Sequence, residues 1–200
     1  MGAPLSPAQQ QQLEGLSMQY GKTVYVEAEI FPGFDDPVRK PDRVGEVCMV
    51  IRRPNGKLLL SIKSIYPRGA YRLPTGGVGI GEPIIAALFR EVNEETGLTV
   101  RVRRFLALIS YRPAGTPAAA PVFHTFAFLL DEVGGTLGAL DASELIEDYI
   151  EIDPSELPRV AERLESLPEN DRGIVGSWRD WGRFRAVVHR VVHEALTAPA

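Results

Sequence analysis

The sequence GGVGIGEPIIAALFREVNEETGL, residues 76–98, is the most informative segment of the chain. It begins with closely spaced glycines, which favour a loop, and continues into a run typical of a helix. Pro83 suits the first turn of such a helix, and Gly97 suits its C-terminal cap. We therefore predict a loop followed by a helix from about Pro83 to Thr96.

Three glutamates share one face of this predicted helix. An α-helix turns about 100° per residue, so Glu91, Glu94 and Glu95 fall within an arc of roughly 100°. Like charges at these spacings repel one another and reduce helix stability. A shared divalent cation removes that cost, and clustered carboxylates select hard ions such as Mg²⁺ or Mn²⁺. The alternative is a solvated acidic face. The opposite arc carries apolar residues that we expect to pack on a sheet: Ile85, Leu88, Phe89 and Val92.

The spacing of the whole stretch separates these alternatives. At roughly 7% per specified residue, a chance match at seven positions is on the order of one in 10⁸ per register. The stretch resembles the Nudix box, complete in its signature positions Gly76, Glu82, Arg90, Glu91, Glu94, Glu95 and Gly97. The resemblance implies an α/β fold, an α/β/α sandwich with a mixed sheet and a loop–helix–loop catalytic motif.

The resemblance also implies an activity and a set of site residues. Members of this family bind divalent ions and hydrolyse a nucleoside diphosphate linked to another group. Glu91, Glu94 and Glu95 are then the ligands of Mg²⁺ or Mn²⁺. Glu94 and Glu95 belong to the catalytic set, together with Arg90 and Glu82, which orient the ligands and the loop. Arg90 stands four residues before Glu94 and can pair with it.

The segment before the helix supplies candidates for substrate binding. Arg68, Tyr71 and Arg72 can meet a phosphate or stack on a base, although an ordinary surface loop is an equal alternative. Gly76 and Gly77 let the backbone approach a phosphate closely.

The sequence differs from the common family pattern at one position, and the family pattern does not identify the general base. The family commonly has a glycine where this chain has Thr75, and threonine tolerates positive φ poorly, so the geometry of its carbonyl is open. A general base outside the box is expected on a later acidic loop. The candidates there are Glu144, Glu147 and Asp148, with a solvated loop as the alternative.

The composition narrows the class of partner. The 200 residues are 44% hydrophobic, which is enough for one buried core, and the net charge of −4 gives no support for a nucleic-acid or membrane surface. We therefore expect a small-molecule nucleotide as partner, with a homodimer possible. No stretch approaches the roughly 20 apolar residues of a membrane span. The single cysteine, Cys48, lies in an apolar run, suits a reducing cytosol and is expected to be buried and inert.

The rest of the chain fits a mixed sheet covered by helices. We predict an N-terminal extension over residues 1–40, made of a peripheral polar helix (6–20), a strand (23–30) and a loop, and a Nudix domain over residues 41–200 that ends in C-terminal helices. Strands are expected at 45–53, 57–64, 99–110, 122–132 and 145–152, a loop at 66–81, and helices at 155–167 and 179–196. Asn55-Gly56 is a strong hairpin signal between the second and third predicted strands.

The substrate is not specified by the box. Pro113 follows Leu98 by fifteen residues, which resembles the subgroup that cleaves ADP-ribose and related sugar nucleotides. We expect such a substrate, with Tyr111 or Arg112 aimed at the site. The alternatives are a nucleoside triphosphate, including an oxidised one, or a non-catalytic nucleotide-sensing module.

The C-terminal helix carries two pairs of residues whose patterns permit a function. His189 and His193 are spaced like a metal-binding pair, but histidines on a helix surface are the preferred interpretation. Trp178 and Trp181 are expected to pack this helix on the body of the protein.

Overall fold

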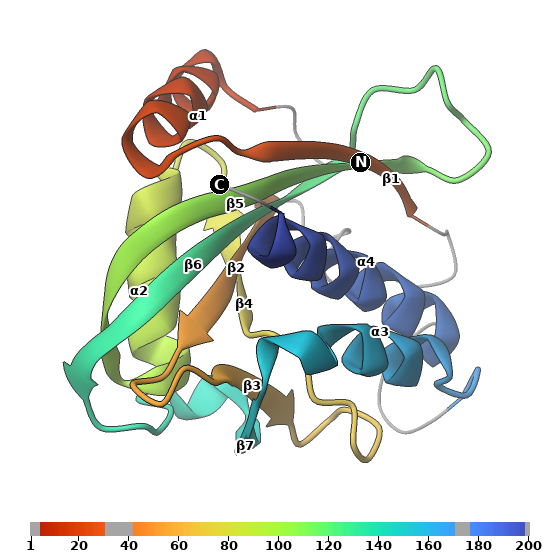
Figure 1. Cartoon of the computed structure of the whole chain (residues 1–200). Helices are drawn as coiled ribbons and strands as arrows, with labels where there is room; N and C mark the ends of the chain where they lie inside the picture. Colours follow the sequence, from red (N-terminus) through yellow and green to blue (C-terminus); the bar gives the residue numbers. More distant parts are fainter. Residues whose placement is uncertain (1–4, 31–41, 171–176, 199–200) are drawn as a thin grey trace.

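A single mixed sheet organises the protein, seen in a computed structural model that describes residues 5–30, 42–170 and 177–198. Its seven strands run in the order β1-β5-β6-β2-β3-β7, with β4 paired to β2 (Figure 1). The β1–β5 and β2–β6 pairs are parallel and the remaining pairs are antiparallel. The strands are β1 (Val24–Ile30), β2 (Arg43–Arg52), β3 (Leu58–Lys63), β4 (Thr75–Gly79), β5 (Leu98–Pro113), β6 (Phe123–Gly135) and β7 (Ile146–Ile152).

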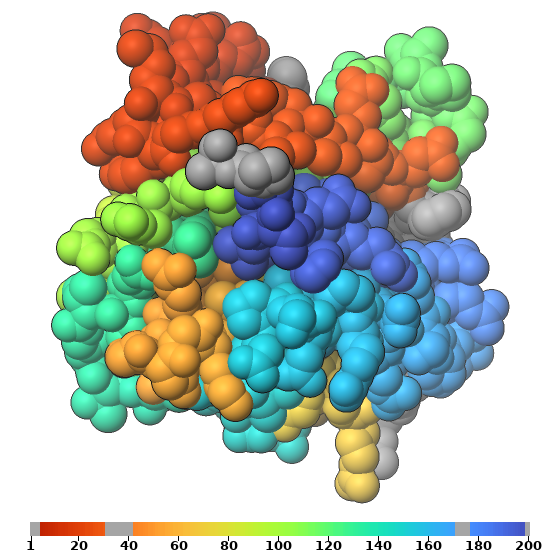
Figure 2. All heavy atoms as spheres, viewed as in Figure 1, coloured from red at the N-terminus to blue at the C-terminus, as the bar shows by residue number. Residues whose placement is uncertain are grey.

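Helices cover both faces of the sheet. α1 (Pro7–Tyr20) and α2 (Ile84–Thr96) pack on one face, and α3 (Leu157–Glu165) and α4 (Trp178–Thr197) pack on the other. Figure 2 shows α3 and α4 side by side over the sheet. The predicted α/β/α sandwich is therefore confirmed. None of the described helices has the length and hydrophobicity needed to cross a membrane.

Strands β2 and β3 separate soon after the hairpin that joins them. Arg52 pairs with Leu58, but β2 then pairs with β4, placing Cys48 opposite Thr75. The chain from β3 to β4 passes between the diverging strands, where Arg72 bridges to Ser61 of β3. We call this opening the fork. The prediction of a loop over residues 66–81 was wrong for β4, because pairing with β2 overrides the weak strand preference of glycine.

The other predicted elements are found within a few residues of their expected bounds. Of the loop predicted over residues 31–43, residues 31–41 lie outside the described part of the chain. Gly97 ends α2 in the left-handed conformation, with φ of 63°. A Cβ at Gly97 would lie 2.8 Å from two backbone carbonyl oxygens, so its glycine is required sterically as well. One core prediction was wrong: Phe89 is 43% exposed, whereas Leu88 and Val92 are buried.

Candidate active site

The first glycine of the box is required by a glutamate that lies over it. A Cβ on Gly76 would lie 1.9 Å from Cδ of Glu91, so any other residue here would displace this side chain from its position. The buried Glu91 is thereby seated between α2 and β4. Thr75, which stands where the family commonly has glycine, lies in β4 and is not among the described residues with positive φ.

Arg90 and Glu82 brace the box loop against α2. The guanidinium of Arg90 donates to Glu82 (3.0 and 3.2 Å) and to the carbonyl of Gly77 (3.0 Å). It also donates to Glu91 (2.8 Å) and Glu94 (3.0 Å), which fixes both carboxylates.

Three carboxylates converge at the fork. One oxygen each of Glu91, Glu94 and Glu144 lies within 4.8 Å of the other two. Glu144 comes from the 3₁₀ turn η1 (Ala142–Glu144), which precedes β7. Of the candidates outside the box, the structure thus brings Glu144 to the box glutamates. Asp148 instead accepts a hydrogen bond from Tyr71, at 2.6 Å.

Glu95 is buried beside this cluster, with 1% of its surface exposed, and its Oε2 has no hydrogen-bond partner among the described residues. The ammonium of Lys63 lies 3.0 Å from Glu95 and 2.6 Å from Glu144. Burial raises the pKa of Glu95 to about 7, although Lys63 and Arg72 act to lower it. Burial acts to raise the pKa of Glu144, but the hydrogen bond and charge of Lys63 outweigh it and the pKa is lowered.

Sequence reasoning missed Lys63. Its only signal was a charged residue at the end of an otherwise apolar strand, Leu58–Lys63. Because Lys63 contacts two of the acidic residues, it supplies a cation where their charges would otherwise repel. The carboxylates fit a hard divalent ion, since all the ligand atoms are oxygens and Oε2 of Glu95 has no hydrogen-bond partner among the described residues.

A small polar cavity of about 110 Å³ adjoins the carboxylates. Glu91 and Glu144 lie on its wall with the backbone of Gly76 and Gly77. The cavity is also lined by four cationic side chains, those of Arg43, Lys63, Arg72 and Arg185. The site thus holds opposite charges within one small space, an arrangement that can bind a metal ion together with an anion.

The predicted substrate-binding arginines occupy different surroundings. Arg72 is buried, and its guanidinium donates to the backbone of Leu73, to Thr75 and to the hydroxyl of Tyr66. Arg68 is exposed and lies at a separate, larger hollow of about 380 Å³.

A second buried carboxylate, Glu46, was also missed. It accepts two hydrogen bonds from Nη1 of Arg185 on α4, at 2.8 and 2.7 Å, and one from Thr125 at 3.1 Å. Arg185 donates further to Thr75 at 3.1 Å. The threonine at the departure from the family thus accepts hydrogen bonds from two buried arginines, Arg72 and Arg185.

The prediction that His189 lies on the helix surface was wrong, because this residue is fully buried. Its Nε2 accepts a hydrogen bond from the backbone N–H of Leu73, at 3.0 Å, so its Nδ1 carries the proton and donates to the carbonyl of Arg185 at 2.7 Å. His189 therefore ties α4 to the segment that leads into β4. His193 is only partly buried and contacts the backbone of Pro154.

Three aromatic residues and the cysteine, whose surroundings were predicted from the sequence, are all buried. Trp178 and Trp181 are buried in the core, as predicted. The expectation that Tyr111 is aimed at the site was wrong, because it is buried against Phe184 of α4. Cys48 is buried as predicted, and burial raises the pKa of its thiol.

Arg112 also points away from the carboxylates. It pairs with Glu27 of β1 and donates to the carbonyls of Pro117 and Ala119 in its own loop. That loop lies at the opposite end of the molecule from η1 (Figure 1). The expectation that Arg112 faces the site was therefore wrong.

The N-terminal helix α1 contacts the box directly. Gln9 donates its side-chain amide to the carbonyls of Gly79 and Glu82, at 3.4 and 3.2 Å. Gln12 accepts from the backbone N–H of Ile84, the first residue of α2, at 2.6 Å. The glutamine run is thus not peripheral, because it caps α2 and holds the box loop.

Curated relatives match somewhat more than half of the chain. It is 34% identical over 114 residues to an ADP-ribose pyrophosphatase of Methanocaldococcus jannaschii, covering 56% of this chain and 63% of that protein. It is 35% identical over 115 residues to the NAD-capped RNA hydrolase NudC of Vibrio atlanticus, covering 57% of this chain and 39% of that protein. The chain therefore spans less than two thirds of the length of each of these relatives.

Solved structures give weaker likenesses. An ADP-ribose pyrophosphatase of Streptococcus suis is 16% identical, with 78% of this chain and 92% of that chain covered and a TM-score of 0.47. A Nudix hydrolase of Nitrosomonas europaea is 25% identical, with 64% and 82% covered and a TM-score of 0.47.

The family model of the NUDIX domain matches residues 42–174, which is more than half of the chain. This match includes the complete box and the residues that bring Lys63 and Glu144 to it. The chain therefore belongs to the Nudix family.

Proposed function

We propose that this protein is a Mg²⁺- or Mn²⁺-dependent pyrophosphohydrolase that cleaves a nucleoside diphosphate linked to another group, preferentially a sugar nucleotide such as ADP-ribose. The observation that carries the proposal is the convergence of Glu91, Glu94 and Glu144 beside the buried carboxylate of Glu95, whose Oε2 has no hydrogen-bond partner among the described residues. Binding divalent ions and substrate together is the simplest use for these groups, since leaving a buried carboxylate unsatisfied costs folding free energy.

The residues divide into holding and orienting roles. Glu91, Glu94 and Glu95 would hold the ion, with Glu144 facing them, and Arg90 fixes two of these carboxylates. A bound ion would supply positive charge against the diphosphate oxygens and lower the pKa of an attacking water.

Three cationic side chains around the small cavity provide for the anionic part of the substrate. Arg43, Lys63 and Arg72 line the cavity and can bind diphosphate oxygens, with Arg72 held in place by its own hydrogen bonds. The diphosphate would then lie between these cations and the ion-binding carboxylates.

For the general base we favour Glu144 over Glu147 and Asp148. It lies with the box glutamates, and its Oε2 receives a hydrogen bond from Lys63, which leaves Oε1 to accept the proton of the attacking water. Asp148 is engaged by Tyr71, and Glu147 is exposed at the larger hollow.

The preference for a sugar nucleotide is supported by the relatives' names. Both ADP-ribose and NAD carry an organic group on each side of a diphosphate, and relatives named for these two compounds match this chain at 34% and 35% identity. A nucleoside triphosphate is the alternative substrate. A non-catalytic sensing module is disfavoured because every box carboxylate is present.

Turnover of ADP-ribose and of nucleoside triphosphates with Mg²⁺ tests the proposal. Phosphatase-released phosphate reports monoester products from ADP-ribose, and pyrophosphatase-coupled release reports pyrophosphate from triphosphates. We expect a higher kcat/KM for ADP-ribose. A tenfold preference for triphosphates, about 1.4 kcal/mol in the transition state, would overturn the substrate assignment.

The assignment of Glu144 is tested in the same assay. Glu144→Gln should reduce kcat by at least about tenfold, because general-base catalysis contributes roughly 10²–10⁴-fold. Glu14→Gln, at an exposed position on α1, is the matched control and should leave kcat unchanged. A normal kcat in Glu144→Gln at saturating Mg²⁺ would remove Glu144 from the mechanism.

A further inference from the structure

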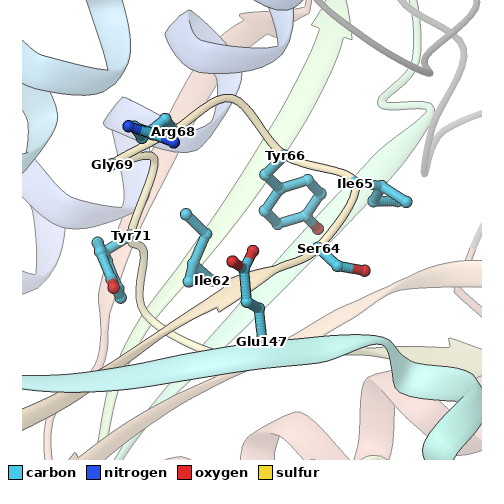
Figure 3. A pocket seen from close by; sticks show the side chains of 8 residues that line it. All are labelled: Ile62, Ser64, Ile65, Tyr66, Arg68, Gly69, Tyr71 and Glu147. Carbon is cyan, nitrogen blue, oxygen red and sulfur yellow. The ribbon is translucent and has the colours of Figure 1, made fainter.

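The larger hollow lies next to the carboxylates at the fork. Its volume is about 380 Å³, within the size range of small-molecule sites, and Tyr66 lines both this hollow and the small cavity beside Glu91. The loop from β3 to β4 and the start of β7 form its walls (Figure 3). A molecule whose charged part lies at the carboxylates can therefore extend into the hollow.

The inner wall of the hollow is a firmly held aromatic ring. Arg72 donates to the hydroxyl of Tyr66 at 3.0 Å. The Tyr66 ring lies 4.7 Å from that of Trp181 and 6.0 Å from that of Trp178. Ile62 and Ile65 add apolar surface on either side (Figure 3). This wall is preorganised for packing against a flat or apolar group.

A free carboxylate points into the same space. Glu147 extends from β7 toward Tyr66 and Ile62, with the hydroxyl of Ser64 nearby (Figure 3). Among the described residues, Glu147 has no hydrogen-bond or ion-pair partner. Its oxygens are therefore available to accept hydrogen bonds from a ligand.

The charges around the hollow select against an anion. Glu147 and the neighbouring Asp148 are both acidic, whereas the nearest cation of the lining, Arg68, lies at the opposite edge from Glu147 (Figure 3). A phosphate beside Glu147 would be repelled. The favoured ligand group is uncharged and rich in hydrogen-bond donors.

We propose that this hollow binds the neutral ribose or nucleoside group attached to the diphosphate, which packs on Tyr66 and donates hydrogen bonds to Glu147. This inference rests on the proposed function, because it places the diphosphate at the carboxylates. It gives Glu147 the role of a specificity residue rather than that of a base. It also predicts discrimination against substrates whose ribose at this end carries a further phosphate.

The first test compares Glu147→Ala with Glu14→Ala, a control at an exposed position of α1. With ADP-ribose and Mg²⁺, Glu147→Ala should raise KM about tenfold and leave kcat within twofold, because the contact is made to a non-reacting group. Glu147→Lys should move the preference, by tenfold or more, toward ADP-ribose that is phosphorylated on the ribose occupying the hollow, which is the 2′-phosphorylated form when that ribose belongs to the nucleoside. A loss of kcat in Glu147→Ala with unchanged KM would instead make Glu147 part of the chemistry.

The second test measures binding without turnover. Calorimetry of ADP-ribose binding in Glu95→Gln, alone and combined with Glu147→Ala, should show a Kd about tenfold weaker in the double variant. Equal Kd values, or an unchanged KM in Glu147→Ala of an active enzyme, would overturn the inference while the proposed function stands. Tight ADP-ribose binding that depends on Glu147, without cleavage of any diphosphate, would instead refute the proposed function.

Discussion

Two buried glutamates at the fork, Glu46 and Glu95, differ in how their charges are met. Glu46, 3% exposed, accepts hydrogen bonds from Arg185 and Thr125 on both of its oxygens. Glu95, 1% exposed, is paired through Oε1 with the ammonium of Lys63 alone, and its Oε2 has no partner among the described residues. The first carboxylate is completed by the protein itself, and the second is not.

The difference separates a structural charge from a binding one. Burying a carboxylate is costly unless hydrogen bonds and an opposite charge replace its water. Glu46 recovers these interactions through α4, so its pair fixes α4 against β2. Glu95 is left with unmet capacity, which a ligand can fill. Three experiments test whether Glu46 serves stability and Glu95 serves ligand binding.

The largest effect is expected on stability, from removing the partner of Glu46. Arg185→Met leaves Glu46 buried without its counter-charge and should reduce the free energy of unfolding by about 3–5 kcal/mol in urea titrations. Arg190→Met on the same helix removes an exposed ion pair with Glu165 and should cost less than about 1 kcal/mol. Equal losses in the two variants would show that burial does not distinguish these pairs.

A substitution of Glu95 should reduce activity rather than stability. Glu95→Gln should lower kcat about 100-fold, equivalent to roughly 2.7 kcal/mol, because it removes a charged ion ligand. Without metal, its unfolding free energy should stay within about 1 kcal/mol of the wild type, since the amide keeps the shape of the side chain, avoids burying a charge, and leaves Lys63 its ion pair with Glu144. Mg²⁺ should stabilise the wild type and Glu14→Gln more than Glu95→Gln. A strongly destabilised metal-free Glu95→Gln would contradict the comparison.

The third effect is a pH dependence of stability that arises from His189 on α4, the helix that also carries Arg185. Burial lowers the pKa of His189 to about 4, from an ordinary value of 6.5, with a further lowering by the charges of Arg72 and Arg185, although the hydrogen bond to the Arg185 carbonyl acts to raise it. The unfolded chain binds the proton first as pH falls, so stability is full above pH 6.5 and declines toward pH 4. The loss should reach about 2 kcal/mol at pH 5.

His189→Gln checks this assignment through unfolding titrations between pH 7 and pH 4. The variant should be less stable than the wild type at pH 7, because the hydrogen bonds of the imidazole are lost, but its stability should fall less steeply with pH. His193→Gln on the same helix is the control and should keep the wild-type slope. A wild-type slope in His189→Gln would assign the acid sensitivity to other groups.

The sequence predicted those parts of the site that follow from spacing along one element. The helical period placed Glu91, Glu94 and Glu95 on one face, and Pro83 and Gly97 marked the ends of α2. Hydrophobic alternation and the Asn55-Gly56 turn gave the strands and the mixed sheet. These signals are local, so one sequence suffices to detect them.

The residues that sequence reasoning missed are joined by tertiary contacts. Lys63 reaches Glu144 across 81 positions, and Arg185 reaches Glu46 across 139. No periodicity relates such residues, because the fork forms only when β3 diverges from β2. The misplacement of Tyr111 has the same cause, since α4 covers it from the far end of the chain.

The contacts of α1 have a consequence for the order in which the nascent chain can become ordered during synthesis. Gln9 and Gln12 bond to partners 70 to 73 positions later, and β1 pairs with β5, which follows α2. An isolated helix of 14 residues is marginal in water, so α1 has little to stabilise it when it leaves the ribosome. The N-terminal segment is therefore expected to become ordered only after β5 and the box loop have been synthesised. The box loop is stabilised by α1 only once these parts of the chain are in contact.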